Sequence, residues 1–396
     1  MQDIVFTEGI LRWYAESGRD LPWRRTRDPY AVWLSEIILQ QTRIAQGTAY
    51  WERFMERFPT VQDLAAASED EVLRLWQGLG YYSRARNLHA AARQIADLGG
   101  FPSTLEGIRA LPGVGDYTAA AIGSIAFGLP AAVVDGNVYR VLARYYGIAT
   151  PVGTTAAKKE FTALATSLLP SDCADATLSP SSGAAAFNQG MMDFGAMVCT
   201  PLSPRCTDCP LAAGCRAYRE GRVAFLPMKK PAAAVQERHL TYIYIRCNGF
   251  TAIHRRGPGD IWQGLWEPIV LSVPDDSSAP KGTLCSGTPH PSDAPAPPNV
   301  SCVPALQELV SVGPLPLPAS GGGHVRSVEY PSSAPLRLVK HGVKHQLTHR
   351  TIYADFYLWE CAERPSLPPD YIWVQEPAFL TDYGKPRLVE RLLEAL

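Results

Sequence analysis

The sequence predicts a multidomain protein in which an all-α domain is followed by an α+β domain. Over residues 1–227, apolar side chains recur at three- and four-residue spacing in segments separated by short runs of Gly and Pro, which is typical of successive helices. Over residues 238–396, apolar and polar residues alternate in several segments, as they do in strands. Residues 228–237 have the composition of a linker between these two regions.

The helical pattern of the first domain is clearest in four segments, VWLSEIILQQT, EDEVLRLWQGL, SRARNLHAAARQIADLG and KKEFTALATSLLP. In the second domain, HLTYIYIRCNGFTAIHRR predicts a β-hairpin, and further strands are expected in LRLVKHGVKHQL, RTIYADFYLWE and YIWVQ. KPRLVERLLEAL predicts a closing amphipathic helix. The stretch at about 273–303 is rich in Pro, Ser, Gly and Ala, so we expect a disordered insertion there.

The composition is that of a soluble globular protein, with 46% hydrophobic and 19% charged residues. No run approaches the roughly 18 apolar residues that span a bilayer, and the N-terminus lacks the basic region of a signal peptide. We therefore expect a cytoplasmic protein of a bacterial cell that makes no membrane contact. The net charge of −1 does not by itself indicate a nucleic-acid partner, but a binding face needs only local Lys and Arg.

Four of the nine cysteines lie close together, in the pattern Cys199-x6-Cys206-x2-Cys209-x5-Cys215. Thiolates clustered in this way hold metal ions in proteins that carry no disulfides. Structural zinc sites usually contain two short Cys-x2–4-Cys pairs, and only one such pair is present here. Four thiolates also hold an iron–sulfur cluster, with one thiolate on each iron. The spacing alone favours neither group strongly.

Two glycines stand in the segment LPGVGDYTAAAI, at residues 111–122. Gly113 and Gly115 let the chain turn tightly, so that backbone N–H groups at the following helix N-terminus face outward. Such groups bind a DNA phosphate without reading sequence. An ordinary turn between two helices has the same residues, so this segment alone leaves both interpretations open.

Two carboxylates have the surroundings that acid–base chemistry needs. Glu36 lies among apolar residues of a predicted helix, where burial raises the pKa of a carboxyl and lets it keep a proton near neutrality. Asp135 precedes the helical run of VVDGNVYRVLAR, where capping the helix is the commonest role of an Asp. Asn137 is placed to hydrogen-bond either Asp135 or Glu36, or to stabilise the turn.

Together these motifs resemble the endonuclease III superfamily of helix-hairpin-helix DNA glycosylases, and within it the MutY family of adenine glycosylases. The resemblance implies a [4Fe-4S] cluster on the four clustered cysteines and a helix-hairpin-helix motif at 111–122. It implies a six-helix subdomain and a cluster subdomain within residues 1–227, with the cluster loop at 199–215. It also implies that Glu36 protonates adenine N7, that Asp135 stabilises the sugar cation and that Asn137 lies beside it.

Further residues match the family's motifs. Tyr117 stands where strand-cleaving relatives carry a Lys that forms a Schiff base, so the resemblance implies a monofunctional enzyme. Tyr81 or Tyr82 in GLGYYSRARNLH would wedge into the base stack opposite the flipped adenine. The remaining matches concern base contacts. Those to the orphaned guanine are Gln40, Gln41 and Thr42, and those lining the adenine pocket are Leu21 and Trp23.

The region 238–396 resembles the C-terminal domain of the MutY family, whose fold is that of the Nudix hydrolases. GDIWQGLWEPIV matches its loop-and-strand entry, but the Mg²⁺-binding Glu residues of the Nudix hydrolases are absent, which implies recognition of 8-oxoguanine without hydrolysis. Many members have Phe-Ser-His in the stretch that contacts 8-oxoguanine, where this chain has Leu347, Thr348 and His349. Thr348 and His349 are the expected readers of the lesion, and Leu347 departs from the family's aromatic residue.

We therefore expect a base-excision-repair enzyme that hydrolyses the N-glycosidic bond of adenine mispaired with 8-oxoguanine or guanine. Its expected partner is double-stranded DNA containing such mispairs, bound by a monomer in the bacterial nucleoid. One alternative is a pyrimidine-lesion glycosylase with lyase action, which Tyr117, Glu36 and the second domain oppose. Another is a damage-binding protein without catalysis that uses a cluster as a redox sensor, which the Glu36–Asp135 pair opposes.

Overall fold

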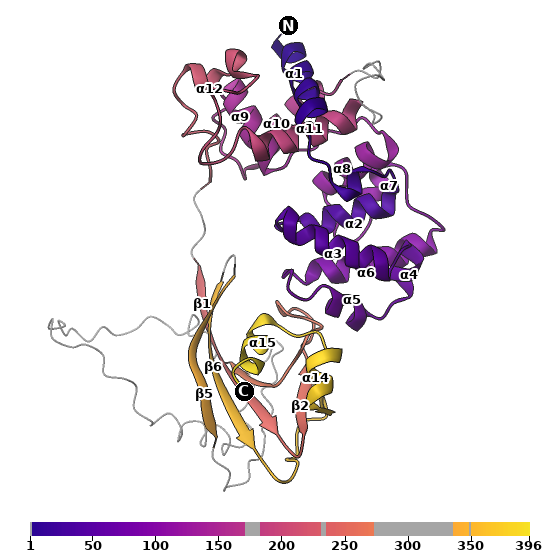
Figure 1. The fold of residues 1–396 in the computed structure, drawn as a ribbon, viewed down its shortest axis with the longest axis vertical. Coiled ribbons are helices and arrows are strands. Elements are labelled where there is room, and N and C mark those ends of the chain that lie inside the picture. The colour runs from indigo at the N-terminus through magenta and orange to yellow at the C-terminus, as the bar shows by residue number, and fades with distance from the viewer. Residues whose placement is uncertain (1, 171–182, 231–234, 273–335, 348–349) are drawn as a thin grey trace, which may run out of the picture. The chain divides into compact units, whose positions relative to one another are not determined.

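The computed structural model describes residues 2–170, 183–230, 235–272, 336–347 and 350–396. Contacts between Cα atoms divide the chain into two compact units, Met1–Ala232 and Ala233–Leu396 (Figure 1). The insertion expected at about 273–303 lies outside the described residues, as do Thr348 and His349. Within the ranges given, no helix has the length and apolar character that crossing a membrane requires.

Helices make up the described part of the first unit, as the apolar spacing predicts, and one isolated bridge joins Val152 to Lys229. The elements are α1 (Gln2–Ser17), η1 (Pro22–Arg24), α2 (Pro29–Leu39), α3 (Ile44–Arg57), α4 (Val61–Ala66), α5 (Glu69–Leu75), α6 (Ser83–Asp97), α7 (Leu105–Arg109), α8 (Asp116–Phe127), α9 (Gly136–Tyr146), α10 (Thr155–Ser167), α11 (Gly183–Met197), η2 (Ala212–Gly214) and α12 (Arg216–Arg219).

Side-chain caps fix where several of these helices begin. Asp28 accepts hydrogen bonds from the backbone N–H groups of Tyr30 and Ala31 at the start of α2. At the start of α4, Thr60 and Asp63 form a reciprocal capping box. The cap at Asp28 sets the N-terminus of α2, the helix that carries Glu36.

Helix α11 is the centre of the first unit and packs against α1, α8 and α9 (Figure 1). Its Asn188 is buried and joins two neighbouring segments. The Asn188 amide N–H groups donate to Ser124 Oγ at 2.9 Å and to the Ala131 carbonyl at 2.8 Å, and its Oδ1 accepts from the Val133 backbone N–H at 3.0 Å. The Val133 N–H and the Ala131 carbonyl are backbone groups of the segment before Asp135, and a buried backbone group that loses its partner is costly. The side chain therefore fixes the extended segment that leads to Asp135.

The second unit has two sheets and two helices, so the α+β prediction is confirmed for its described residues. One sheet has the order β4-β1-β6-β5, in which β1 and β6 are parallel and the other pairs antiparallel. The other has the order β3-β2-β7 and is antiparallel throughout. The bounds are β1 (Gln236–Arg246), β2 (Phe250–Arg255), β3 (Trp266–Glu267), β4 (Ile269–Ser272), β5 (Arg337–Gln346), β6 (Arg350–Glu360), β7 (Tyr371–Gln375), α14 (Glu376–Asp382) and α15 (Arg387–Leu393).

The β-hairpin predicted from HLTYIYIRCNGFTAIHRR is only partly correct. Asn248 and Gly249 have positive φ angles of 50° and 80°, as a tight Asn-Gly turn requires, and Cys247 bridges to Phe250 across it. Beyond that bridge the strands separate, because β1 pairs with β4 and β6 while β2 pairs with β3 and β7. Both edges of β1 are occupied, so β2 enters the other sheet.

Candidate active site

Most of the residues that the sequence singles out in the first unit line one cavity of about 300 Å³. Its walls come from η1, α2, the segment after α2, α8, the start of α9 and α11. The predicted residues that line it are Leu21, Trp23, Glu36, Gln40, Gln41, Thr42, Tyr117, Asp135 and Asn137. The structure places the other described candidates, Tyr81, Tyr82, Gly113 and Gly115, outside this lining.

Glu36 is buried in α2, with 8% of its surface exposed, as its apolar neighbours lead us to expect. Burial raises the pKa of its carboxyl, and the nearby charge of Asp135 raises it further. Two groups lower the pKa of Glu36: the Tyr117 hydroxyl, which donates to Glu36 Oε2 at 2.9 Å, and the Arg24 guanidinium. Burial is the largest of these effects, so the pKa of Glu36 lies above its ordinary value.

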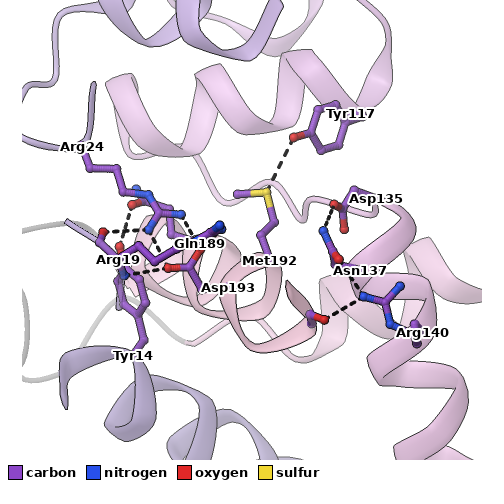
Figure 2. A network of polar contacts seen from close by, with 11 residues as sticks. Tyr14, Arg19, Arg24, Tyr117, Asp135, Asn137, Arg140, Gln189, Met192 and Asp193 are labelled. Atoms are coloured by element: carbon purple, nitrogen blue, oxygen red, sulfur yellow. Dashed lines mark hydrogen bonds and ion pairs between the residues drawn. The ribbon is translucent and has the colours of Figure 1, made fainter. Parts of the chain in front are cut away.

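Asp135 is the N-cap of α9, and its Oδ1 accepts from the Val138 backbone N–H at 2.8 Å. Its Oδ2 accepts from the Asn137 amide at 2.7 Å, which resolves the two partners that the sequence left open for Asn137 (Figure 2). Burial raises the pKa of Asp135, whereas the Val138 and Asn137 hydrogen bonds lower it. Capping and lining the cavity are therefore compatible roles of one carboxylate.

Arg140 connects this end of the cavity to the segment that follows α11. Its guanidinium donates to Asn137 Oδ1 and to the Gly195 carbonyl, each at 2.7 Å, and to the Cys199 carbonyl at 2.7 Å. Figure 2 shows Arg140 beside Asn137, on the side away from Tyr117. The Asn137 side chain is thus held between Asp135 and Arg140.

A buried ion-pair network lies at the other end of the cavity (Figure 2). The Asp193 carboxylate of α11 is fully buried and accepts from both terminal nitrogens of Arg24, at 2.7 and 2.9 Å. It also accepts from the Arg19 backbone N–H and from Arg19 Nε, each at 2.9 Å. Arg19 and Arg24 line the cavity beside Gln189, whose Oε1 accepts from the Tyr14 hydroxyl at 2.7 Å. Asp193 therefore fastens the η1 segment, which supplies Leu21 and Trp23, to α11.

The two tyrosines of GLGYYS differ in exposure. Tyr82 is buried, whereas the Tyr81 side chain is 47% exposed and its backbone has a positive φ of 49°, which is uncommon for a residue with a Cβ. Gly80, with a φ of 70°, precedes it in the same tight turn. Of the two residues, only Tyr81 presents its ring at the surface.

Arg84 ties the Tyr81 turn to the end of α2. Its Nη1 donates to the carbonyls at the C-terminus of α2, and its Nη2 donates to carbonyls of the turn, at distances of 2.5 to 3.3 Å. These acceptors are Ile37, Ile38, Gln40, Leu79 and Gly80. The bonds satisfy carbonyls that a helix C-terminus leaves unpaired.

The predicted hairpin at 111–122 lies between α7 and α8, and its glycines have different conformations. Gly113 has a φ of 75°, and a Cβ there would come within 2.7 Å of the Asn87 side chain. Gly115 is the N-cap of α8 in an extended conformation, with φ at −93°, and a Cβ there would meet no atom within 4 Å. The prediction that both glycines permit the turn is therefore wrong for Gly115, whose backbone conformation other residues adopt.

The four clustered cysteines are free thiols that follow α11 and surround η2. Burial, together with the charges of the other three thiolates, raises the pKa of Cys209 to about 11. The four thiols therefore lie near one another. Arg144 organises the loop: its guanidinium donates to Cys199 Sγ at 3.4 Å and to the Thr200 carbonyl at 2.7 Å. Within the described ranges, no group of three or more His, Cys, Asp or Glu side chains has the arrangement of a metal site.

The second unit places only part of the predicted lesion-reading strand. Leu347 follows β5 directly, and its backbone N–H donates at 2.8 Å to the carbonyl of Arg350, the first residue of β6. Thr348 and His349 lie between these two residues and outside the described part of the chain.

Comparison with known proteins identifies the family. The model of the HhH-GPD superfamily of base excision DNA repair proteins matches residues 34–167. An adenine DNA glycosylase of Buchnera aphidicola subsp. Schizaphis graminum is 36% identical over 265 residues, an alignment that covers 66% of this chain and 74% of that protein. The chain belongs to the adenine DNA glycosylase family. This confirms the family predicted from the sequence motifs.

Other members of the adenine DNA glycosylase family are longer. The human protein is 46% identical over 225 residues, which cover 54% of this chain and 39% of the human one. With the rat and mouse relatives covered to 44%, the chain spans less than half the length of these mammalian proteins. A solved thermostable thymine-DNA glycosylase is 32% identical, covers 55% of this chain and 97% of its own length, and superposes with a TM-score of 0.49.

Sequence analysis missed several residues of the cavity, of which Arg24, Gln189 and Met192 line it directly. Met192 Sδ lies 3.6 Å from the Tyr117 hydroxyl (Figure 2). Gln189, Met192 and Asp193 all belong to one turn of α11, in the segment NQGMMDF. An Asp within an otherwise apolar helix is the signal that was available, because a buried charge requires a partner.

We predict that Asp193→Asn lowers the free energy of unfolding by about 3 kcal/mol, because it removes the buried carboxylate on which two half-buried guanidinium groups converge. Burial alone would raise the pKa of Asp193, but the hydrogen bonds from Arg24 and Arg19 outweigh it and hold that pKa below its ordinary value. The carboxylate's contribution is therefore present at neutral pH and lost as the pH falls through the folded-state pKa. Urea denaturation at neutral and acidic pH measures both effects.

Asp20→Asn is the matched control, since Asp20 pairs with Arg25 on the exposed surface. Exposed pairs contribute little, so its unfolding midpoint should equal that of the unsubstituted chain. An Asp193 variant as stable as this control would contradict the role given to the network.

Proposed function

We propose that this chain is a monofunctional DNA glycosylase that hydrolyses the N-glycosidic bond of adenine paired with 8-oxoguanine or guanine. The observation that carries the proposal is the pair of carboxyl groups, Glu36 and Asp135, that line one cavity in different surroundings. Two carboxyl groups with different environments divide the roles of acid and charge stabiliser. Membership of the adenine DNA glycosylase family supports adenine as the base released.

Glu36 is the proton donor in this proposal. Burial raises the pKa of its carboxyl, which favours the protonated form that an acid needs, and in the proposal the flipped base enters the cavity that Glu36 lines. Protonation at adenine N7 makes the base a better leaving group, so the electrons of the N-glycosidic bond pass to the purine. Tyr117 holds the Glu36 carboxyl in place through its hydrogen bond to Oε2.

Asp135 stabilises the sugar as the bond breaks. Positive charge develops on the deoxyribose, and a carboxylate close to that sugar attracts it. Asn137 and the Val138 N–H each hydrogen-bond the carboxylate, which favours its ionised form. Water then adds to the sugar carbon, which leaves an abasic site.

Tyr117 supports a reaction without strand cleavage. A phenol forms no imine with the sugar, and the Tyr117 hydroxyl is already engaged with Glu36 and lies beside Met192. In this proposal Tyr117 positions Glu36, at the place where strand-cleaving relatives are expected to carry a lysine.

DNA contacts in the proposal come from two turns of the first unit. The exposed ring of Tyr81 enters the base stack at the position that the flipped adenine leaves, and the N–H groups that begin α8 bind a phosphate. The extended N-cap at Gly115 leaves these N–H groups without a side-chain cap. A monomer suffices for both contacts.

The four cysteines fit a [4Fe-4S] cluster by their chemistry. Cys199, Cys206, Cys209 and Cys215 are free thiols near one another, and Arg144 directs a donor at Cys199 Sγ, where a thiolate would lie. When bound, the cluster would cross-link the loop after α11 through four iron–thiolate bonds. Arg140 contacts the Cys199 carbonyl, so the fold of this loop supports the segment beside Asn137.

The second unit supplies the preference for 8-oxoguanine in this proposal. The flipped adenine occupies the first unit, so the opposite base stays in the duplex, where a second surface reads its altered edge. Thr348 and His349 are the proposed readers, each able to form a hydrogen bond. The Nudix-like identity of this unit belongs to the same proposal, supported by its mixed and antiparallel sheets.

The purified chain should release adenine fastest from duplexes in which the adenine lies opposite 8-oxoguanine, and more slowly where it lies opposite guanine. Duplexes with cytosine or thymine opposite the adenine should give little product. Single-turnover assays on these four duplexes, with and without base treatment, measure both selectivity and strand cleavage. Strands should break only after base treatment. Release of thymine instead of adenine, or cleavage without base, would contradict the proposal.

In the same assay, Glu36→Gln should lower the rate of adenine release by at least about 10³-fold while mismatch binding is retained, since the amide cannot donate the proton. Asp135→Asn should show a loss of similar order. Glu106→Gln, on the exposed face of α7, is the matched control and should react like the unsubstituted chain.

The rate of adenine release should fall as the pH rises through the folded-state pKa of Glu36, because only the protonated carboxyl is active. Tyr117→Phe removes a hydrogen bond that lowers this pKa, so the fall should occur at higher pH in the variant. Tyr139→Phe, whose ring packs on Phe161 outside the cavity lining, is the control. A shift to lower pH in the Tyr117 variant would assign the proton donor to another group.

Protein purified without exposure to air should contain about four irons and four sulfides per chain and be brown. Cys209→Ser should lose most of the iron, whereas Cys247→Ala in the second unit should retain it. Stoichiometric zinc in place of iron would replace the cluster proposal with a structural zinc site.

A further inference from the structure

Two cysteines outside the candidate site face each other at the ends of two parallel strands. The register of β1 and β6 pairs Arg246 with Glu360, so the next residues, Cys247 and Cys361, are neighbours. The ladder continues there, since the Cys361 backbone N–H donates to the Arg246 carbonyl at 3.0 Å. The Asn248 side chain fixes the following position by donating to the Ala362 carbonyl at 2.9 Å.

The side chains of this pair lie on the same face of the sheet. Register partners in parallel strands point to the same side, and both cysteines pack in one apolar cluster with Ile245 and Trp359, the preceding pair in the same alternation. Neighbouring strands lie about 4.8 Å apart, which is within the range of Cα separations, about 4.4–6.8 Å, that a disulfide spans.

The two thiols are free and in contact. Burial and the neighbouring Cys247 side chain together raise the pKa of Cys361 to about 11. Cys247 is 1% exposed, whereas Cys361 is half-buried, so a reagent from solvent reaches Cys361 first. Few thiolates form at neutral pH, which makes reaction with oxidants slow.

We propose that Cys247 and Cys361 are an oxidative modification site that forms an intramolecular disulfide, with peroxides or small disulfides as oxidant. With a peroxide, Cys361 Sγ attacks the O–O bond, becomes a sulfenic acid and releases an alcohol or water. Cys247 Sγ then attacks that sulfur, an S–S bond forms and water leaves. The two thiols lose two electrons and the peroxide gains them.

The product would link β1 to β6 at the end where β1 turns into β2. The chain between the cysteines runs through the strands of both sheets, so the link closes a long loop in the unfolded chain and reduces its conformational freedom. The pair therefore acts as a reversible cross-link of the second unit, and it does not depend on the proposed glycosylase activity.

The test equilibrates the full chain with glutathione buffers of increasing oxidised fraction at pH 8.5, alkylates the free thiols and digests with trypsin without reduction. Cleavage after Arg246, Arg255, Arg350 and Arg387 places each cysteine in its own peptide, 247–255 and 351–387. We expect a joined species, with the mass of both peptides less two hydrogens, that replaces the separate alkylated peptides as the oxidised fraction rises. Reduction should restore them.

Cys361→Ser and Cys247→Ala are the matched controls, and neither should yield the joined species. The proposal is overturned if both peptides stay alkylated in the most oxidising buffer. Glutathione attached to Cys361 without a joined peptide would overturn it too, because it would show that an accessible thiol does not reach its neighbour. A link from either cysteine to any other residue would have the same consequence.

Discussion

Burial of the Glu36 carboxyl is the constraint on which the first unit depends. A carboxyl within an apolar helix must keep its proton or find compensation, and α2 supplies little beyond its own backbone. The compensation comes from other elements: a hydroxyl from α8 and a cation from η1. That cation needs a carboxylate of its own, which α11 provides through Asp193. Three other elements of the first unit are therefore held together by the groups that compensate the buried Glu36 carboxyl.

The same logic explains why α11 is central. Its Asn188 satisfies the backbone before Asp135, its Asp193 pairs with two arginines, and its Met192 lies against Tyr117. Of these side chains, Met192 lines the cavity itself, while Asn188 and Asp193 hold segments that do. A small number of polar side chains on this mostly apolar helix therefore hold several segments that are distant in sequence. A shift of the helix would disturb the cavity.

How much the sequence revealed depended on the range of each interaction. Helical spacing and apolar neighbours predicted α2 and the burial of Glu36, because both are properties of adjacent residues. The pairing of Asp193 with Arg24 could not be predicted in this way, since it joins residues 169 positions apart and depends on the fold. The expected hairpin was only partly correct for a similar reason: the Asn-Gly turn is local and forms, but the partners of β1 come from β4 and β6. At Gly115 the prediction failed for a different reason. A glycine suggested a backbone conformation that only glycine adopts, but Gly115 is extended, as other residues can be.

Arg84 gives the first unit a mechanical property. One guanidinium holds the carbonyls that end α2 and those of the turn that presents Tyr81. The two segments consequently move as one body, because displacing either of them stretches hydrogen bonds to the same planar group. The turn that presents the exposed Tyr81 ring is hydrogen-bonded through Arg84 to the last turn of α2, which includes Glu36. One guanidinium thus joins the segment of the surface ring to the segment of the buried carboxyl.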